Sequence, residues 1–417
     1  MNPLFQQDPE IYHAITRETT RQELGLELIA SENYASPAVI AALGTVLTNK
    51  YSEGYIGKRY YAGNEIIDEI EALAISRAKE LFSAEHANVQ ALSGSPANAA
   101  VYFATIKPGD KVMGLKLDHG GHLSHGHPVN FSGMLYNFVQ YGVNESTGLI
   151  DMDQVREVAL RERPKMIVVG FSAYSRNIDW KGFKAIADEI GAITFGDIAH
   201  IAGLIAGKAI ENPVPLFDIV TTTTHKTLRG PRGALILCKE KFAKDIDRSV
   251  FPGMQGGPHD HMTAAKAVCF KEALSPQFQD YARKVIQNAQ GLASGLQKRG
   301  YTILTGGTDN HLLVVDLRTQ ELTGKIAEKA LDAVAISCSR STIPGDTRKA
   351  MDPSGIRLGT PAVTTRGLQL SDMDTLAELV HQAISNHANP AQLQVIKSEV
   401  ESLCKKYPLY IGTNLEV

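Results

Sequence analysis

Three short apolar stretches in the middle of the chain determine its architecture: KMIVVGFS (165–172), AITFGD (192–197) and DIVTTTTHK (218–226). Each is bounded by residues that break regular structure, which is typical of a buried strand. An amphipathic helix is expected between the first two, near residues 181–190. Strands that alternate with helices predict βαβ units, so we expect an α/β fold with a mostly parallel sheet and helices on both faces.

The three predicted strands all end in polar residues. Ser172 and Asp197 close the first two strands, and the pair His225–Lys226 closes the third. In open α/β sheets, ligands bind outside the carboxyl ends of the strands. The sequence therefore predicts an active site at this edge of the sheet.

The flanking segments predict further elements. Helical periodicity covers residues 65–82, and a second helix is expected to begin in SGSPANAAVYFATI (93–106). A long helix over 276–299 precedes the strand-like HLLVVDLR (311–318) and a helix near 324–334. We therefore expect an N-terminal arm (1–20), a large domain (21–280) and a smaller α+β C-terminal domain (281–417).

Composition excludes several classes of protein. The chain has 417 residues, of which 43% are hydrophobic and 21% charged, so large-scale disorder is not expected. A net charge of −3 provides no basic surface for nucleic acid or for an anionic membrane. No apolar run approaches the length of a membrane span, and the first residues lack the apolar core of a signal peptide. Four widely spaced cysteines without a CxxC pair predict neither a disulfide scaffold nor a structural zinc site, and the expected location is a reducing cytoplasm.

Lys226 lies in the run TTTTHKTLRGPRG (221–233), at the predicted end of a strand. A lysine held in a pocket is what Schiff-base chemistry requires, although a surface lysine at a turn fits the spacing equally well. Asp197 favours the first interpretation, because a pyridoxal-phosphate enzyme needs a carboxylate on the pyridine nitrogen of its cofactor. Adjacent strand ends can place the two groups at opposite ends of one ring. His200 can then stack over the ring, or it is an ordinary hydrogen-bonded polar residue.

Two segments offer a phosphate cradle, and a third offers a proton-transfer group. SGSPAN (93–98) presents hydroxyls and backbone N–H groups at a helix start, and Gly256–Gly257 forms a second possible backbone cradle. Each also fits an ordinary cap or turn. Glu53, in KYSEGYIGKRYYAG (50–63), is the candidate general acid and base, since nearby hydroxyls can tune a carboxylate. The alternative is a surface loop whose tyrosines only pack: Tyr51, Tyr55, Tyr60 and Tyr61.

Two further features invite a ligand interpretation. The four histidines of HGGHLSHGH (119–127) match no zinc spacing, and the glycines indicate a tight turn beside a ligand, so no metal is expected. Arg357, in SGIRLGTPA, can hold a carboxylate with two parallel hydrogen bonds, or it is a surface arginine.

With these segments in view, the chain resembles serine hydroxymethyltransferase over nearly its whole length. The resemblance rests on eleven motifs in order: ELIASEN, LTNKYSEGY, GKRYYAGNE, AEHANVQ, HGGHLSHG, VNFSG, FSAYS, DIAHIAG, TTTTHKTLRGPRG, FPGMQGGP and GIRLGTPA. It implies a fold-type I enzyme dependent on pyridoxal 5'-phosphate. The implied reaction transfers the hydroxymethyl group of serine reversibly to the co-substrate tetrahydrofolate, giving glycine and 5,10-methylenetetrahydrofolate.

The resemblance also implies roles for matching residues. Lys226 would bind the cofactor covalently, Asp197 would pair with its pyridine nitrogen, and His225 would lie beside the lysine. Cofactor contacts would come from Lys226, Asp197, His200, His122, Ser93, Gly94, Ser95, Ser172, His225, Tyr51, Gly256 and Gly257.

The substrate side of the implied site has three parts. Arg357, with Ser31 and Tyr61, would hold the amino acid, and Glu53 would move protons on the hydroxymethyl group. Tetrahydrofolate would lie against Leu117, Gly121, Leu123 and Tyr60. Because Glu53, Tyr51 and the Gly256–Gly257 pair would come from a neighbouring copy, a homodimer at least is expected.

The chain departs from the family pattern mainly where the pterin would bind. The family commonly has Asn at the place of Ser341 and Ser-Pro-Phe at 349–351, residues that touch the pterin. These and the remaining departures are Ile56, Pro96, Asp118, His127, Ser341, Lys349, Ala350 and Met351. The altered loop motivates an alternative: an enzyme acting on 2-methylserine, or a folate-independent aldolase or transaldolase on β-hydroxy amino acids. A further alternative is a non-catalytic binding protein on an enzyme scaffold.

Overall fold

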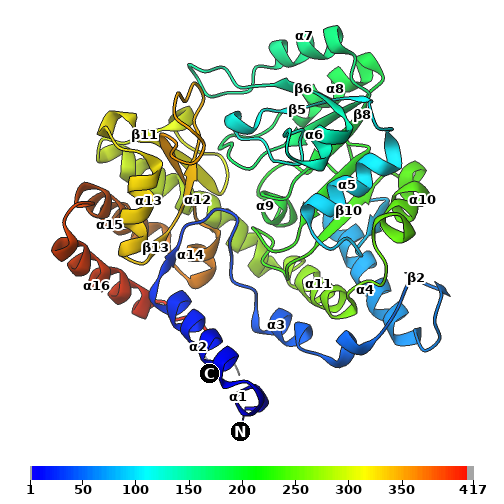
Figure 1. Ribbon diagram of the computed structural model, residues 1–417, viewed down its shortest axis with the longest axis horizontal. Helices are drawn as coiled ribbons and strands as arrows, with labels where there is room; N and C mark the ends of the chain where they lie inside the picture. Colours follow the sequence, from blue (N-terminus) through cyan, green and yellow to red (C-terminus); the bar gives the residue numbers. More distant parts are fainter. Residues whose placement is uncertain (1, 411–417) are drawn as a thin grey trace. The chain divides into compact units, whose positions relative to one another are not determined.

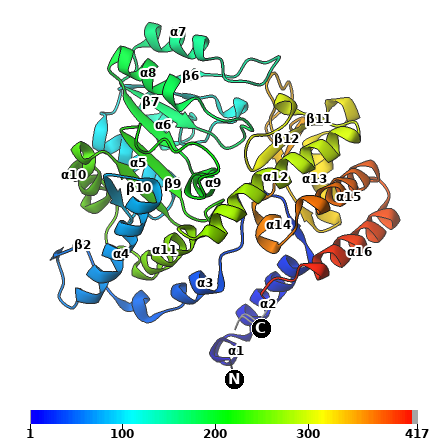
Figure 2. The ribbon, with the colours of Figure 1, turned by 180° about the vertical axis from the view of Figure 1, so that it is seen from behind.

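The computed structural model describes residues 2–410, and the chain divides into two compact units (Figures 1 and 2). The large unit comprises Ala38–Arg283 together with Ile343–Gly345. The small unit comprises Met1–Pro37, Lys284–Thr342 and Asp346–Val417. Within residues 2–410, no helix is both long enough and apolar enough to cross a membrane.

The large unit is built around a seven-stranded sheet with the strand order β4-β10-β9-β8-β7-β5-β6. The five strands from β9 to β6 are parallel to one another, whereas β10 pairs antiparallel with both of its neighbours, β9 and the edge strand β4. A separate hairpin pairs β2 with β3. The strands are β2 (Gly54–Tyr55), β3 (Lys58–Arg59), β4 (His86–Asn88), β5 (Lys111–Leu115), β6 (Asn137–Tyr141), β7 (Met166–Gly170), β8 (Ile193–Asp197), β9 (Ile219–Thr223) and β10 (Ala234–Cys238).

The three strands predicted from the central apolar stretches are confirmed as β7, β8 and β9, and they are neighbours in the sheet. Every residue of β7, β9 and β10 is buried, as expected for strands covered on both faces. The predicted helix near 181–190 is α8 (Trp180–Ile190). The α/β fold with a mostly parallel sheet is therefore confirmed.

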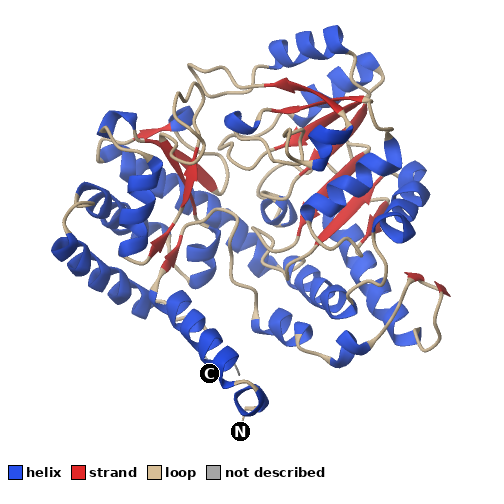
Figure 3. Cartoon of the chain, in the orientation of Figure 1, coloured by secondary structure: helices blue, strands red, loops and turns tan. Residues whose placement is uncertain are grey.

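Helices enclose this sheet (Figure 3). Helix α8 begins where the Asp179 side chain accepts the Gly182 N–H, and it ends at Gly191, whose φ of +73° favours glycine. The helices are α3 (Pro37–Leu43), α4 (Glu65–Phe82), α5 (Gly94–Thr105), α6 (Phe131–Leu135), α7 (Met152–Glu162), α8, α9 (Ala202–Ala206), α10 (Glu240–Arg248) and α11 (Asp260–Ala273). Helix α12 (Pro276–Lys298) begins in the large unit and ends in the small one.

The small unit has a four-stranded antiparallel sheet with the order β11-β12-β15-β14 and a short parallel pair, β1 with β13. Its apolar core includes Leu313 and Val315 of β12, and Ile356 and Leu358 of β15. The strands are β1 (Leu26–Glu27), β11 (Thr302–Ile303), β12 (Leu312–Asp316), β13 (Ile336–Ser337), β14 (Ser339–Ser341) and β15 (Gly355–Gly359). The helices are α1 (Pro3–Gln7), α2 (Pro9–Leu24), α13 (Gly324–Ala333), α14 (Pro361–Arg366), α15 (Met373–Ser385) and α16 (Pro390–Lys406).

The N-terminal helices α1 and α2 contain no buried residue. The end of α2 is nevertheless anchored in the small unit by Arg366, whose side chain is nearly buried. Its guanidinium donates to the backbone carbonyls of Gln22 and Gly25, both at 2.9 Å.

Candidate active site

Asp197 is the last residue of β8, at the carboxyl edge of the central strands. In the sheet register it lies between Gly170 of β7 and Thr221 of β9. A side chain at Gly170 would collide with this strand, since its Cβ would lie 2.3 Å from the Asp197 carbonyl oxygen. The carboxylate therefore occupies a tightly packed position in the middle of the sheet.

Three groups hold the Asp197 carboxylate. Asn98 Nδ2 donates to Asp197 Oδ2 at 2.8 Å, His125 Nε2 lies 3.1 Å from the same oxygen, and the Ala199 N–H donates to Oδ1 at 3.1 Å. Burial acts to raise the pKa of Asp197, but the hydrogen bonds from His125 and Asn98 outweigh it and lower the pKa below its usual range. The protein thus maintains a buried anion at the end of β8.

His122 is held as a neutral imidazole beside this anion. The Ser124 N–H donates to His122 Nδ1 at 3.1 Å, so that Nδ1 accepts and the remaining proton is on Nε2. Burial lowers the pKa of His122 to about 4, and electrostatic interactions with His125 and Lys226 act in the same direction. A neutral ring of this kind can lie against another aromatic ring without a charge penalty.

The ligand atoms of His122, His125 and Asp197 lie within 4.8 Å of one another, a spacing that can also hold a metal ion. These atoms already have hydrogen-bond partners, however. His125 Nε2 contacts Asp197, and Ser124 Oγ lies 2.7 Å from His122 Nδ1. The cluster is therefore better described as a hydrogen-bond relay that ends on the Asp197 carboxylate.

Lys226 follows β9 by three residues and lies within electrostatic range of both His122 and His225, whose pKa values its ammonium helps to lower. The next residue, Thr227, fixes the local backbone. Thr227 Oγ1 donates to the His200 carbonyl and accepts the Gly203 N–H, both at 2.9 Å. The loop that carries Lys226 is thereby joined to the loop that carries His200, which is itself buried.

His225 is also held neutral. Burial lowers its pKa to about 4, and the positive charges of Arg232 and Lys226 contribute. Arg232 Nη1 lies 3.3 Å from His225 Nε2, whereas the buried Nδ1 has no hydrogen-bond partner within the described part of the chain. A polar atom left in this way beside a lysine is typical of a site that binds a further group.

The first turn of α5 lies at the end of β9. A Cβ on Gly94 would lie 2.9 Å from Thr223 Cγ2, so only glycine fits without a shift. The Ser93 side chain makes no capping hydrogen bond to the helix, which leaves the N-terminal N–H groups near Ser95 available to an anion. Gln255 joins the loop that contains Gly256 and Gly257 to the start of α5, since the Leu92 N–H donates to Gln255 Oε1 at 3.1 Å.

The histidine-rich loop borders the same edge of the sheet. The N–H of Ser172 donates to the Gly120 carbonyl at 2.7 Å, which fixes the end of β7 to this loop. A Cβ on Gly121 would lie 2.2 Å from the Leu115 carbonyl oxygen, so the turn requires glycine. Of the predicted folate contacts in this loop, Leu123 is exposed and Leu117 is half-buried.

A second group of predicted site residues lies beside the hairpin β2–β3, which Figures 1 and 2 place at the outer edge of the large unit. Tyr51 Oη lies 3.4 Å from Glu53 Oε1, and the rings of Tyr51 and Tyr61 meet edge to face with centroids 5.1 Å apart. A Cβ on Gly256 would lie 3.1 Å from Glu53 Oε1, and one on Gly257 would touch the Tyr51 ring at 3.6 Å. Tyr60, largely exposed, contacts Phe251 edge to face. The structure thus gathers these residues into one cluster.

Arg357 belongs to the small unit, in the middle of β15. Its Nε donates to Ser339 Oγ at 3.2 Å, and burial lowers the pKa of the guanidinium to about 10, which leaves it charged at neutral pH. Ser31 follows Ala30, which packs against the end of the same strand: a Cβ on Gly359 would lie 2.5 Å from Ala30 Cα. The predicted amino-acid contacts of this unit are therefore on neighbouring segments.

The altered loop 339–351 is internally braced. Asp346 accepts the Ser354 N–H at 2.9 Å and the Ser354 hydroxyl at 2.8 Å, and Arg340 Nη1 donates to the Met351 carbonyl at 2.7 Å. The Met351 side chain is 73% exposed. An apolar side chain displayed on an ordered loop is available to a ligand.

Sequence reasoning missed the residues that surround Asp197. Asn98 donates to both Asp197 and Ser124 at 2.8 Å and accepts the Thr221 hydroxyl at 2.7 Å, and His125 completes the set. One signal was present in the sequence: Asn98 follows the candidate cradle Ser93–Ser95 by one helical turn and so lies on the same side of α5. Which histidine of the 119–127 segment would reach the carboxylate could not be read from spacing.

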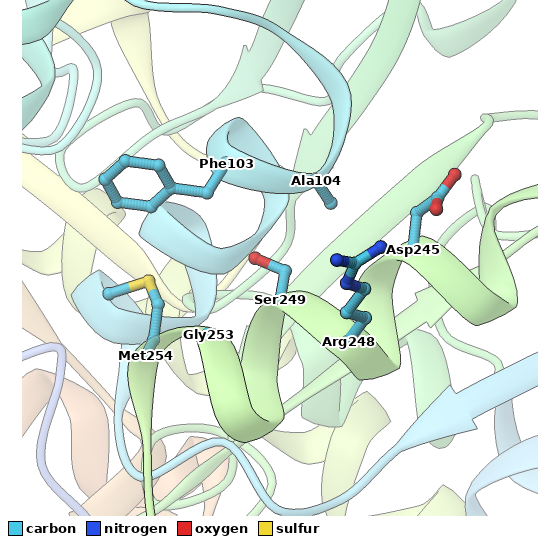
Figure 4. A pocket seen from close by; sticks show the side chains of 7 residues that line it. All are labelled: Phe103, Ala104, Asp245, Arg248, Ser249, Gly253 and Met254. Atoms are coloured by element: carbon cyan, nitrogen blue, oxygen red, sulfur yellow. The ribbon is translucent and has the colours of Figure 1, made fainter.

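A surface cavity of about 420 Å³ lies elsewhere in the large unit, between α5, the end of α10 and the segment that follows α10 (Figure 4). Phe103 and Met254 form one end of it, and Arg248 and Asp245 form the other. It contains none of the predicted site residues.

The residues at the edge of the sheet fit pyridoxal 5'-phosphate by their chemistry. Asp197 is a buried anion suited to a pyridinium nitrogen, Lys226 is suited to an aldehyde, and the uncapped start of α5 is suited to a phosphate. Comparison with protein families agrees with this fit: a family model described as "Serine hydroxymethyltransferase" matches residues 4–380.

Proposed function

The chain belongs to the serine hydroxymethyltransferase family, and from this premise we propose that it transfers the hydroxymethyl group of serine to tetrahydrofolate. Members of the family are pyridoxal-phosphate-dependent enzymes that interconvert serine and glycine, and this chain is such an enzyme. The finer part of the proposal is the acceptor. We take it to be tetrahydrofolate, so that the products are glycine and 5,10-methylenetetrahydrofolate.

The observation that carries the proposal is the anion kept at the end of β8. The cofactor, when bound, supplies an electron sink for the electron pair left at the substrate Cα. Asp197 would hold a proton on its pyridine nitrogen, and the hydrogen bonds from Asn98 and His125 keep Asp197 ionised for that task. Lys226 would bind the cofactor's aldehyde carbon, with neutral His122 over the ring and His225 beside the lysine.

The remaining proposed contacts belong to the residues around Asp197, to the residues around Glu53, and to the segments near β15 of the small unit. His200, Ser172 and the Ser93–Ser95 turn would complete the cofactor site. Arg357 and Ser31 would hold the substrate carboxylate, with Tyr61 nearby. Leu117, Gly121, Leu123 and Tyr60 would face the folate.

We further propose a homodimer in which each site takes residues from two copies. The cluster of Tyr51, Glu53, Gly256 and Gly257 carries proton-transfer and anion-binding groups, yet Tyr51 and Glu53 immediately precede a hairpin at the outer edge of their unit. A second copy that receives this cluster would complete its site. Glu53 would then move the proton of the hydroxymethyl group as the Cα–Cβ bond breaks. All four cysteines are buried free thiols, which suits the cytoplasm.

The specific alternative is a folate-independent aldolase, and Ser341 and the 349–351 segment favour it because they differ from the family's pterin contacts. The deciding experiment measures glycine formation from serine by the cofactor-loaded protein, with and without tetrahydrofolate, alongside 2-methylserine and threonine. A rate that rises at least about tenfold with folate supports the proposal. Equal rates would refute it and assign aldol cleavage, whereas preference for 2-methylserine would change the substrate.

A further inference from the structure

Arg59 belongs to strand β3 of the hairpin that follows Glu53, and its side chain is buried. Only 4% of its side chain is exposed, and its guanidinium is fully engaged. Nε donates to Asp68 Oδ1 and Nη2 to Glu71 Oε2, both at 2.8 Å, so two sides of the fork meet carboxylates of α4. The third nitrogen, Nη1, faces the hairpin backbone instead.

Nη1 of Arg59 donates to the carbonyl of Ser52 at 3.0 Å and to the carbonyl of Gly54 at 2.8 Å. These are the two residues on either side of Glu53. We infer that Arg59 is a positioning residue, which fixes the backbone of Glu53 and thereby places its carboxylate for proton transfer. The inference deepens the proposed function and rests on the role given there to Glu53.

Other contacts hold the same three-residue segment. Ser52 Oγ lies 2.7 and 2.9 Å from the two carboxylate oxygens of Asp260 and donates to this group. Gln90 Nε2 donates to the Gly54 carbonyl at 3.0 Å, and the Glu53 carbonyl accepts the Tyr60 N–H at 3.0 Å. Every peptide carbonyl from Ser52 to Gly54 is therefore bonded, and Arg59 accounts for two of the three.

The Glu53 side chain itself is less constrained. Glu53 is only half-buried, and its Oε1 has a long contact of 3.4 Å with Tyr51 Oη. A mobile side chain on a fixed backbone can reach a substrate from a defined origin. A donor misplaced by about 1 Å lowers the rate of proton transfer on the order of 100-fold. The position of the Glu53 backbone therefore determines the rate.

Ion pairing alone does not account for this arrangement. A lysine could satisfy the charges of Asp68 and Glu71, but it could not also span two carbonyls, because it lacks the planar fork of arginine. The distinction leads to a test with Arg59→Lys, which keeps the charge and removes the fork.

The test is a double-mutant cycle on the cofactor-loaded protein, with serine turnover in the presence of tetrahydrofolate as the readout. Arg59→Lys should lower turnover by about 10- to 100-fold in the wild-type background. In the Glu53→Gln background the same change should lower it by less than about twofold, because the group that Arg59 positions is already gone. Equal losses in both backgrounds would overturn the inference.

A second readout uses the protein without cofactor. The Tyr60 amide, which donates to the Glu53 carbonyl, should exchange its hydrogen at least about tenfold faster in Arg59→Lys. Arg77→Lys is the matched control, since the guanidinium of Arg77, a residue of α4, also donates to a backbone carbonyl, that of Ala267 at 2.8 Å, away from the hairpin. Unchanged exchange in Arg59→Lys, or equal acceleration in Arg77→Lys, would also overturn the inference.

The design also distinguishes a failure to fold, and a failure of the proposed role of Glu53, from a failure of the inference about Arg59. If Arg59→Lys does not fold, Arg59→Met combined with Glu71→Gln removes the buried cation and its buried partner together, and this variant enters the same cycle. If Glu53→Gln alone leaves turnover unchanged, the proposed role of Glu53 is wrong and the inference about Arg59 fails with it. Loss of activity in Glu53→Gln with equal Arg59 effects refutes only the inference.

Discussion

Asn98→Asp tests whether the folded protein keeps Asp197 ionised. The substitution is isosteric, and the Thr221 and Ser124 hydroxyls can still bond the new side chain, so the main change is a second carboxylate 2.8 Å from Asp197 Oδ2. Two charges about 3 Å apart at an effective dielectric constant of about 20 repel by about 5.5 kcal/mol. The two carboxylates can avoid this repulsion by keeping one proton between them. Keeping that proton costs about 1.4 kcal/mol for each pH unit above about 4, the ordinary pKa of a carboxyl group.

The sign of the pH dependence follows from linkage. The pair in the folded variant retains a proton that the unfolded chain releases above about pH 4, so the variant loses stability as the pH rises through that window. Relative to the wild type, the free energy of unfolding should fall by about 1.5 kcal/mol at pH 5 and by about 5 kcal/mol at pH 8. Urea unfolding of both proteins without cofactor, at the two pH values, measures this difference in the free energy of unfolding.

The chain offers a matched control in Asn88→Asp. Asn88 Nδ2 also donates to a carboxylate at 2.8 Å, that of Asp247, but the Asp247 side chain is 26% exposed against 10% for Asp197. Solvent should screen this pair, so its pH-dependent loss should be less than half as large. The reasoning is refuted if Asn98→Asp costs the same at pH 5 and pH 8, or if both variants show the same dependence.

Three other predictions concern the same unit. Lys226→Ala should abolish folate-dependent serine turnover, and retained turnover would exclude the proposed role of this lysine. Gly94→Val should weaken pyridoxal-phosphate binding at least about tenfold in a titration of cofactor absorbance, because a Cβ there would lie 2.9 Å from Thr223 Cγ2; unchanged affinity would show that the turn is not the phosphate site. Burial lowers the pKa of Lys266 to about 7, so the folded protein releases a proton that the unfolded chain keeps, and stability should rise between pH 7 and 9. Lys266→Met should flatten this rise in pH-resolved urea unfolding, and an unaltered slope would contradict the assignment.

The central strands could be predicted because their signal is local. Strand β7 is a continuous apolar run, β8 ends in Asp197, and β9 begins with Ile219 and Val220 before a series of threonines. Parallel strands must place the polar residues that close or follow them at one edge. The expectation that Asp197 and Lys226 share an edge followed from that geometry alone. The contacts of Asn98 and His125 with Asp197 could not be predicted, because they join residues 99 and 72 positions apart.

The hairpin shows the same limit more clearly. Its tyrosines and Glu53 marked the segment as chemically active, but nothing local indicates that Arg59 turns toward Asp68 and Glu71 rather than toward solvent. That orientation depends on α4 packing beneath the hairpin. In the small unit, likewise, the bond of Arg366 to the Gln22 carbonyl spans 344 positions. Contacts of this length are set by the folded core and leave no periodic pattern in the sequence.

The departures from the family pattern differ in their structural consequences. Pro96 is the third residue of α5, in the first turn, where its missing N–H breaks no intrahelical bond. Ile56 lies in the two-residue turn between β2 and β3, where the following Gly57 takes a φ of +69° and accommodates the reversal. Neither substitution disturbs a contact of Asp197 or of Arg59.

The changes at Ser341 and in the 349–351 segment are of another kind. They leave a braced loop whose displayed side chain, Met351, is apolar and largely exposed. Since the groups around Asp197 belong to the large unit and this loop belongs mostly to the small one, we expect changes in the loop to affect the acceptor and not the groups that hold Asp197. Variation in this family member is therefore expected in folate affinity and acceptor choice, while cleavage at Cα remains intact. Replacing Met351 with Phe should accordingly change the KM for tetrahydrofolate and leave folate-independent cleavage of threonine unaltered; a parallel loss of both would show that the loop acts on the cofactor site as well.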